Sequence, residues 1–311
     1  MHPFPSDPGS ATPPGRDPQS SAQPGPPRRA EGGGADHPTP ASIDRRRVEH
    51  HLGAVQSRPP REPSAAGLRV GLFFTCLVDL MRPNVGFASA RLLEDAGCQV
   101  EVPDSQTCCG QPAFNAGDNR TARDLAVHWI EAFERFDYVV VPSGSCAGMI
   151  RAHYPQLVAT DPDLRSRMLD ACERTWELTS FLVDVCGMHK PPGDYRGAMT
   201  YHDSCSGLRE LGVRDQPREL LRAMPHLALH EMGDARACCG FGGTFAVKYG
   251  DVSAAIADEK IAQIAATGAP CVAMGDVGCM LHLEGRLRRL GDATTQVMHV
   301  AEVLVHEAGD A

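Results

Sequence analysis

The sequence predicts an α/β protein made of two duplicated, Rossmann-like halves with parallel sheets, preceded by a disordered N-terminal tail. From Leu68 onward, short apolar runs alternate with helical patterns. This alternation is typical of parallel sheets with right-handed crossovers. The order of runs restarts near Met199, and each of the two resulting halves carries one Cys-Cys-Gly motif. The repetition indicates a duplicated unit.

The first 66 residues differ from the rest in composition. They contain 14 of the 25 prolines and none of the 12 cysteines. A segment of this kind buries too little apolar surface to offset its chain entropy, so we expect disorder. We therefore divide the chain into a disordered tail (1–66), a first half with bridging helices (67–197) and a second half (198–311).

In the first half, the pattern predicts three strands, two helices and a bridging helical region. The strands are expected at 69–75, 99–103 and 138–141, the last being continuously apolar as in a strand covered on both faces. The helices are expected at 85–96 and 119–136, because apolar residues recur there at helical spacing. The bridging helical region is expected at 164–185, with a break near Thr179 left open.

The second half repeats this order with its own apolar runs. Its strands are expected at 199–202, 230–232, 271–274 and 296–300. Its helices are expected at 218–224, 252–266 and 280–290.

Composition excludes several classes of protein. The formal charge is −9 and no basic stripe is present, which argues against a nucleic-acid partner. No run of about 18 apolar residues occurs, so we expect no transmembrane segment. The tail lacks the basic start and apolar stretch of a secretory signal, which favours a cytoplasmic location. In that setting the cysteines indicate metal binding rather than disulfides.

Eight cysteines follow one rule, since each lies beyond the carboxyl end of a predicted strand. They form a first set and a second set of four at similar spacing: Cys76, Cys108, Cys109 and Cys146, and then Cys205, Cys238, Cys239 and Cys279. The carboxyl ends of parallel strands meet at one edge of the sheet, where ligands bind. Each half is therefore expected to gather four thiols, which suits a 4Fe–4S cluster.

Glycines accompany these cysteines. Gly110 and Gly240 complete the two Cys-Cys-Gly motifs, and Gly144 and Gly278 precede the last cysteine of each set. We expect them to let the backbone pass close to a cluster, so that its amides donate to the cluster. Zinc is the alternative metal. It usually takes cysteine pairs two to four residues apart, and no Cys-x-x-Cys occurs in this sequence.

The remaining cysteines have no partner in the opposite copy. We expect them to be small apolar core residues: Cys98, Cys172, Cys186 and Cys271.

Two further residues are candidate catalytic groups. His202 lies three residues before Cys205, where the first half has Phe73, so the two copies are not equivalent. It is a candidate for a hydrogen bond to the cluster, an iron ligand or a proton carrier. The alternative is a strand-end histidine bonded to a backbone carbonyl. Lys248 is a candidate to offset cluster charge or to bind a carboxylate, with a plain surface lysine as the alternative.

Five stretches resemble one known family. They are Phe-Thr-Cys-Leu-Val-Asp (74–79), Cys-Cys-Gly-Gln-Pro-Ala-Phe-Asn (108–115), Pro-Ser-Gly-Ser-Cys (142–146), Cys-Cys-Gly-Phe-Gly-Gly-Thr-Phe (238–245) and Met-His-Val-Ala-Glu-Val-Leu (298–304). On these residues the chain resembles the Cys-Cys-Gly, or cysteine-rich, domain family over about 68–304. That family includes the B subunit of heterodisulfide reductase and the iron–sulfur subunit of glycolate oxidase. The resemblance is closest to its lactate-utilization subfamily.

The chain departs from the family pattern twice. The family has a cysteine, then Cys-Cys-Gly, then Cys-x-x-Cys, whereas Ser143 and Asp276 stand where the first cysteine of the last pair is expected. In heterodisulfide reductase, five thiolates hold noncubane clusters. With four thiols in each half, the resemblance implies two 4Fe–4S clusters. A noncubane variant and an oxygen ligand from Ser143 or Asp276 stay open as alternatives.

The resemblance implies an iron–sulfur electron-transfer subunit of an L-lactate (2-hydroxy acid) oxidation system. Such a chain is an oxidoreductase subunit rather than a complete enzyme. It works with a ferredoxin-like iron–sulfur subunit and a third lactate-utilization subunit, and the small 2-hydroxy acid is bound at the level of the complex. The chain itself lacks the tight cysteine run of bacterial ferredoxins. The alternatives are a stand-alone heterodisulfide-type reductase and a structural metal-binding module.

Overall fold

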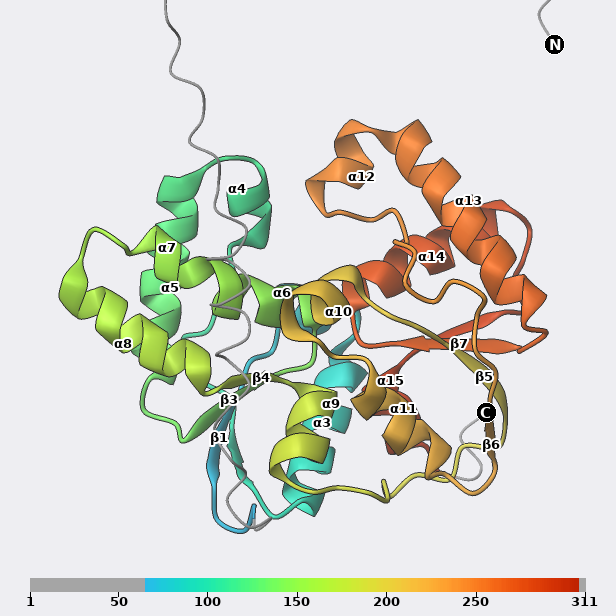
Figure 1. Cartoon of the computed structure of the whole chain (residues 1–311), viewed down its shortest axis with the longest axis horizontal. Helices are drawn as coiled ribbons and strands as arrows, with labels where there is room; N and C mark the ends of the chain where they lie inside the picture. Colours follow the sequence, from blue (N-terminus) through green and yellow to red (C-terminus); the bar gives the residue numbers. More distant parts are fainter. Residues whose placement is uncertain (1–64, 308–311) are drawn as a thin grey trace, which may run out of the picture. The chain divides into compact units, whose positions relative to one another are not determined.

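The computed structural model of the protein describes residues 65–307 and contains two parallel sheets with the same strand order. The first sheet has the order β2-β1-β3-β4 and the second β6-β5-β7-β8, and every pairing in both is parallel. Helices flank both sheets (Figure 1). The predicted α/β class and its duplicated halves are thus confirmed. The predicted tail lies outside the described residues except for Ala65 and Ala66, and Ala65 is buried in the core.

The first half contains four strands and a series of mostly short helices. Its strands are β1 (Arg69–Leu72), β2 (Gln99–Glu101), β3 (Tyr138–Val141) and β4 (Thr175–Glu177). Its helices are α2 (Cys76–Met81), α3 (Pro83–Asp95), α4 (Gln111–Asn115), α5 (Asn119–Phe133), α6 (Gly144–Gly148), α7 (Tyr154–Leu157), α8 (Pro162–Glu173) and α9 (Leu178–Ser180). Two π-helical segments follow α6 and α9, η2 (Met149–His153) and η3 (Phe181–Val185).

The second half repeats the plan. Its strands are β5 (Gly197–His202), β6 (Leu227–Leu229), β7 (Cys271–Met274) and β8 (Gln296–His299). Its helices are α10 (Cys205–Leu211), α11 (Asp215–Arg222), α12 (Thr244–Lys248), α13 (Gly250–Ala266), α14 (Val277–Arg289) and α15 (Val300–Leu304).

Two predicted elements are wrong. The segment 164–185 is helical at both ends but contains an unpredicted strand, because α8 ends at Glu173 and β4 then pairs with β3. The predicted strand at 230–232 lies instead at Leu227–Leu229, where it pairs with β5. In both cases the pairing partner is distant in sequence, so local apolar spacing does not reveal it.

The two halves share a core and meet through matching helix pairs. One apolar cluster combines Leu72 and Leu92 of the first half with Tyr201 and Val300 of the second. Helix α6, which follows β3, packs against α10, and α14, which follows β7, packs against α2. Each contact therefore joins the helix that follows the third strand of one half to the helix that follows the first strand of the other.

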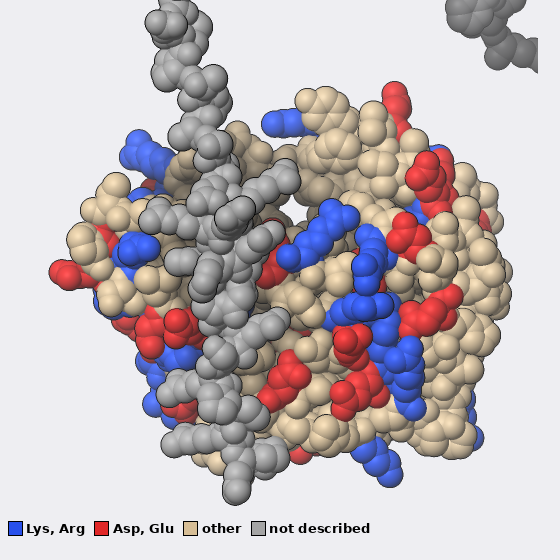
Figure 2. All heavy atoms as spheres, viewed as in Figure 1, with Lys and Arg blue, Asp and Glu red and all other residues tan. Residues whose placement is uncertain are grey.

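The surface carries charges of both signs. Figure 2 shows basic and acidic side chains interspersed on one face. Within α11, buried Arg218 pairs with Asp203 at 2.7 Å and with Glu231 at 2.9 Å. The helices in the described part of the chain are all too short or too polar to cross a bilayer.

Candidate metal centres

The structure brings the four cysteines of the first set together. Cys76 begins α2, whose first turn is capped by Thr75, and Cys146 lies in α6. Cys108 and Cys109 lie in the loop between β2 and α4. The Cys76 and Cys108 sulfurs are 3.8 Å apart, and the Cys109 and Cys146 sulfurs are 3.3 Å apart. The set thus consists of two thiol pairs in contact.

The second set repeats this arrangement. Cys205 begins α10, which Ser204 caps, and Cys279 lies in the first turn of α14. The Cys239 and Cys279 sulfurs are 3.2 Å apart, and the Cys205 thiol hydrogen-bonds to Cys238. Because equivalent elements carry equivalent cysteines, the predicted duplication extends to the geometry of the two sets.

The glycine of each Cys-Cys-Gly motif aims a backbone amide at the first cysteine. The Gly110 N–H donates to the Cys108 sulfur at 3.4 Å, and the Gly240 N–H to the Cys238 sulfur at 3.3 Å. Both glycines have positive φ angles, +79° and +91°, which other residues rarely adopt. A Cβ on Gly240 would also lie 2.5 Å from the Ser253 carbonyl oxygen. The motif therefore requires glycine for conformation and, in the second half, for space.

In each set the first cysteine of the Cys-Cys-Gly motif has a lowered pKa and the second has a raised one. Hydrogen bonds with the Cys109 and Cys76 thiols lower the pKa of Cys108 to about 2. Hydrogen bonds with the Cys205 and Cys239 thiols lower the pKa of Cys238 to about 2. Hydrogen bonding to these same cysteines, with burial, raises the pKa of Cys109 and Cys239. Since the thiolate is the form that ligates metals, Cys108 and Cys238 are ready donors.

Gly144 and Gly278 allow close packing around the helices that carry the last cysteine of each set. A Cβ on Gly144 would lie 2.4 Å from the Ser204 hydroxyl and 3.0 Å from the Gly207 backbone. Gly144 thus allows α6 to approach α10 of the other half. A Cβ on Gly278 would lie 2.6 Å from the Phe241 ring.

Ser143 and Asp276 meet at the boundary between the halves. Each caps the helix that carries the last cysteine of its set. The buried Asp276 carboxylate accepts from the Gly278 N–H at 3.0 Å, from the Ser145 N–H at 2.8 Å and from the Ser143 hydroxyl at 3.2 Å. The two positions that depart from the family pattern therefore hydrogen-bond to each other and link α6 to α14.

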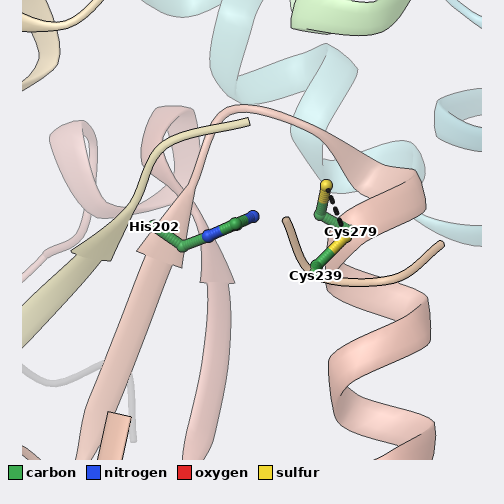
Figure 3. A group of neighbouring side chains, drawn as sticks. All are labelled: His202, Cys239 and Cys279. Atoms are coloured by element: carbon green, nitrogen blue, oxygen red, sulfur yellow. Dashed lines mark hydrogen bonds between the residues drawn. The ribbon is translucent and has the colours of Figure 1, made fainter. Parts of the chain in front are cut away.

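His202 lies beside the second set. It ends β5, is fully buried, and points toward Cys239 and Cys279 (Figure 3). A ring nitrogen of His202 and the sulfurs of these two cysteines lie within 4.8 Å of one another. Neither ring nitrogen has a hydrogen-bond partner, so the carbonyl-bonded alternative does not apply. Burial, with the nearby Lys260 charge, lowers the pKa of His202 to about 3, which leaves the ring neutral.

The lysine that lies near the second set is not the one that the sequence indicated. Lys248, the sequence candidate, is exposed at the end of α12. Lys260, which the sequence analysis missed, is only 1% exposed, and its ammonium donates to the Asp234 carbonyl oxygen at 2.7 Å. Its charge acts on Cys238 and Cys239. The sequence contained one sign of this burial, because Lys260 falls at helical spacing on the buried side of α13.

The other four cysteines are mainly core residues. Cys98, Cys172 and Cys271 are buried, as expected. The Cys172 thiol donates to the Ile150 carbonyl oxygen at 3.1 Å. Cys186 differs, since it is half-buried and hydrogen-bonds to Cys98.

The donor chemistry of both sets fits a thiophilic metal group. All twelve cysteines lie within the described residues and none forms a disulfide. Backbone amides point at Cys108 and Cys238, and His202 offers unpartnered nitrogens. An iron–sulfur cluster uses both thiolate ligands and donors to its sulfides.

Comparisons with known proteins agree with this arrangement. A family model described as CCG, cysteine-rich domain, matches residues 70–151 and 199–284, one copy in each half. The chain is 44% identical over 237 residues to lactate utilization protein A of Geobacillus sp. (strain WCH70), covering 76% of this chain and 99% of that protein. It is 45% identical over 237 residues to the protein of the same name from Bacillus pumilus (strain SAFR-032), with the same coverage.

A solved structure shares the fold. The crystal structure of a hypothetical protein from Helicobacter pylori matches with a TM-score of 0.57 at 9% identity, over 85% of this chain and 54% of that one. At this identity the match concerns the fold alone. The family match covers both cysteine sets, and the two relatives are matched over nearly their whole length. The chain therefore belongs to the CCG cysteine-rich domain family, together with these lactate utilization A proteins.

Proposed function

We propose that the protein is an iron–sulfur electron-transfer subunit of a cytoplasmic system that oxidises L-lactate or a related 2-hydroxy acid. The observation that carries the proposal is the duplicated set of four thiols, built by equivalent elements in both halves. The names of the relatives support lactate as the substrate of the system. Four thiolates in each half suit two 4Fe–4S clusters, held by the eight cysteines described above.

The residues of this chain hold the clusters and tune them. A bound cluster supplies reversible one-electron transfer. The Gly110 and Gly240 amides, which reach Cys108 and Cys238, stabilise negative charge at each set. The helix pairs α6–α10 and α2–α14 carry cysteines of both sets at the boundary between the halves. This arrangement supports electron transfer between two centres within one chain.

The chemistry on the 2-hydroxy acid belongs, in this proposal, to the complex. The cavity at the boundary between the halves, lined by Glu177, Tyr201 and Asp203 among others, has a volume of about 10 Å³. That is room for about one water molecule. A larger cavity of about 400 Å³, lined by Glu284, Arg288 and His306 among others, includes none of the eight cysteines in its lining. A ferredoxin-like iron–sulfur subunit and a third subunit would complete the system.

The first test is iron and acid-labile sulfide per chain after anaerobic purification, with EPR of the dithionite-reduced protein. About eight iron and eight sulfide are expected for two 4Fe–4S clusters. Zinc without sulfide would contradict the proposal and indicate a structural metal module.

The second test separates a subunit from a complete enzyme. Lactate is expected to reduce the clusters only when partner subunits are added. Reduction of a disulfide by this chain alone would instead identify a heterodisulfide-type reductase.

A further inference from the structure

The second cysteine set has a nitrogen donor at a position where the first set has none. His202 is 0% exposed, and its ring is directed at Cys239 and Cys279 (Figure 3). Among residues 65–307, this is the one group of three histidine, cysteine or acidic side chains whose ligand atoms lie so close together. The donor set is one nitrogen and two sulfurs, which suits iron as well as zinc.

Packing alone does not account for a histidine at this position. Phe73 lies at the matching position of the first half, is also fully buried, and packs edge-on against Phe133 at 5.4 Å between ring centres. The fold therefore accepts an apolar ring there. A buried polar atom without a partner destabilises the folded protein, because it has lost its hydrogen bonds to water. In His202 both ring nitrogens are of this kind, and coordination of a metal would satisfy one of them.

We propose that His202 is a metal ligand of the second centre, binding through a ring nitrogen beside Cys239 and Cys279, whereas the first centre has thiolate ligands only. The assignment of that metal as iron in a cluster rests on the function proposed above. In this arrangement His202 binds in place of one of the four thiolates that the proposed function assigns to the second centre, and where imidazole replaces thiolate in iron–sulfur centres, the reduction potential rises. The second centre therefore has the higher potential and is the one that holds the electron.

The test is pulsed EPR of the reduced, anaerobically purified full-length protein, prepared with natural-abundance and with ¹⁵N-labelled histidine. The expected result is a nitrogen coupling of directly bonded strength that changes with the label and belongs to one of the two centres. This comparison uses the unmodified protein, so it does not depend on the folding of any variant. Absence of a label-sensitive coupling of that strength would overturn the proposal.

Two variants assign the coupling to its residue. His202→Phe places the side chain of the first half in the second and is expected to abolish the coupling and to lower the potential of the second centre. His282→Gln is the matched control, because His282 also lies near the second set, where its ring hydrogen-bonds to Ser253. It is expected to keep the coupling. Persistence of the coupling in His202→Phe would overturn the proposal.

Metal analysis separates this inference from the proposed function. Iron and sulfide without a His202-dependent coupling would contradict the proposed His202 ligand and leave the proposed function intact. Zinc without sulfide would contradict the proposed function. Zinc-edge X-ray absorption would then show whether His202 binds the metal. Loss of imidazole scattering in His202→Phe would support His202 as a ligand, and an unchanged spectrum would overturn it.

Discussion

The two cysteine sets have the same scaffold but different surroundings. The first set lies against aromatic rings: Trp129 stacks on Phe133 at 5.5 Å, and the Tyr154 hydroxyl donates to the Cys109 carbonyl oxygen at 2.8 Å. The second set lies against a histidine and a buried lysine, His202 and Lys260.

The two sets differ in the residues that occupy matching positions of the two halves. A Cβ on Gly110 would lie 3.4 Å from Leu125, and a Cβ on Gly240 would lie 3.2 Å from Ile256. Four residues beyond Leu125 and Ile256 lie Trp129 and Lys260. Duplication has thus kept the strand order and the thiols and changed what surrounds them. A buried cation stabilises an added electron, whereas an apolar shell does not. The comparison teaches that a duplicated fold can place two equivalent sets of four thiols in different electrostatic surroundings.

The largest effect is expected from removal of one thiol in each set. Cys109→Ser and Cys239→Ser are each expected to lose about half of the iron, because each set holds its own cluster. The EPR signal that remains should be that of the other half. Cys172→Ser is the control, since its thiol donates only to a backbone carbonyl, and it should keep all iron. Iron loss in the control would contradict the division between ligand and core cysteines.

The next effect concerns the aromatic shell of the first set. Trp129→Ala is expected to lower the free energy of unfolding by about 3–5 kcal/mol, because the ring is 2% exposed and packs against Phe133 and Tyr154. Denaturant titration measures the change. Leu290→Ala, at an exposed position in the other half, is the matched apolar truncation and should change stability little. Equal losses would show that the ring does not form part of the core.

A smaller effect is expected at the boundary between the halves. Asp276→Ala should lower the free energy of unfolding by about 1–3 kcal/mol, because three donors lose their acceptor. Ser143→Ala should cost less, about 0.5–1.5 kcal/mol, since Ser143 mainly caps one helix end. A double-mutant cycle measures their coupling. Iron content should stay unchanged in both, and its loss would favour the oxygen-ligand alternative.

The smallest effect is expected from the buried lysine. Lys260→Met should lower the potential of the second centre by an amount on the order of tens of millivolts, because a nearby positive charge is lost. The first centre should not shift. Lys248→Met, on the exposed end of α12, is the control and should leave both potentials unchanged in a redox titration followed by EPR. If Lys260→Met shifted the potentials of both centres, the buried lysine would not distinguish the second set from the first.

Much of the fold was predictable because its signals are local. Alternating apolar runs and helical periods predicted the parallel sheets and the duplication. The exceptions, β4 and β6, are three-residue strands. Their existence and limits depend on hydrogen bonds to β3 and β5, which are distant in the sequence. Short strands are stabilised by such pairing more than by intrinsic propensity.

At the candidate site, the sequence by itself determined the eight thiols, the two Cys-Cys-Gly motifs and the inequality of Phe73 and His202. Only the tertiary structure decided that Ser143 bonds to Asp276 and that the buried lysine is Lys260 rather than Lys248. The physical reason is that a motif specifies its own backbone and side chains. Burial, charge and contacts between halves arise from residues that only folding brings together.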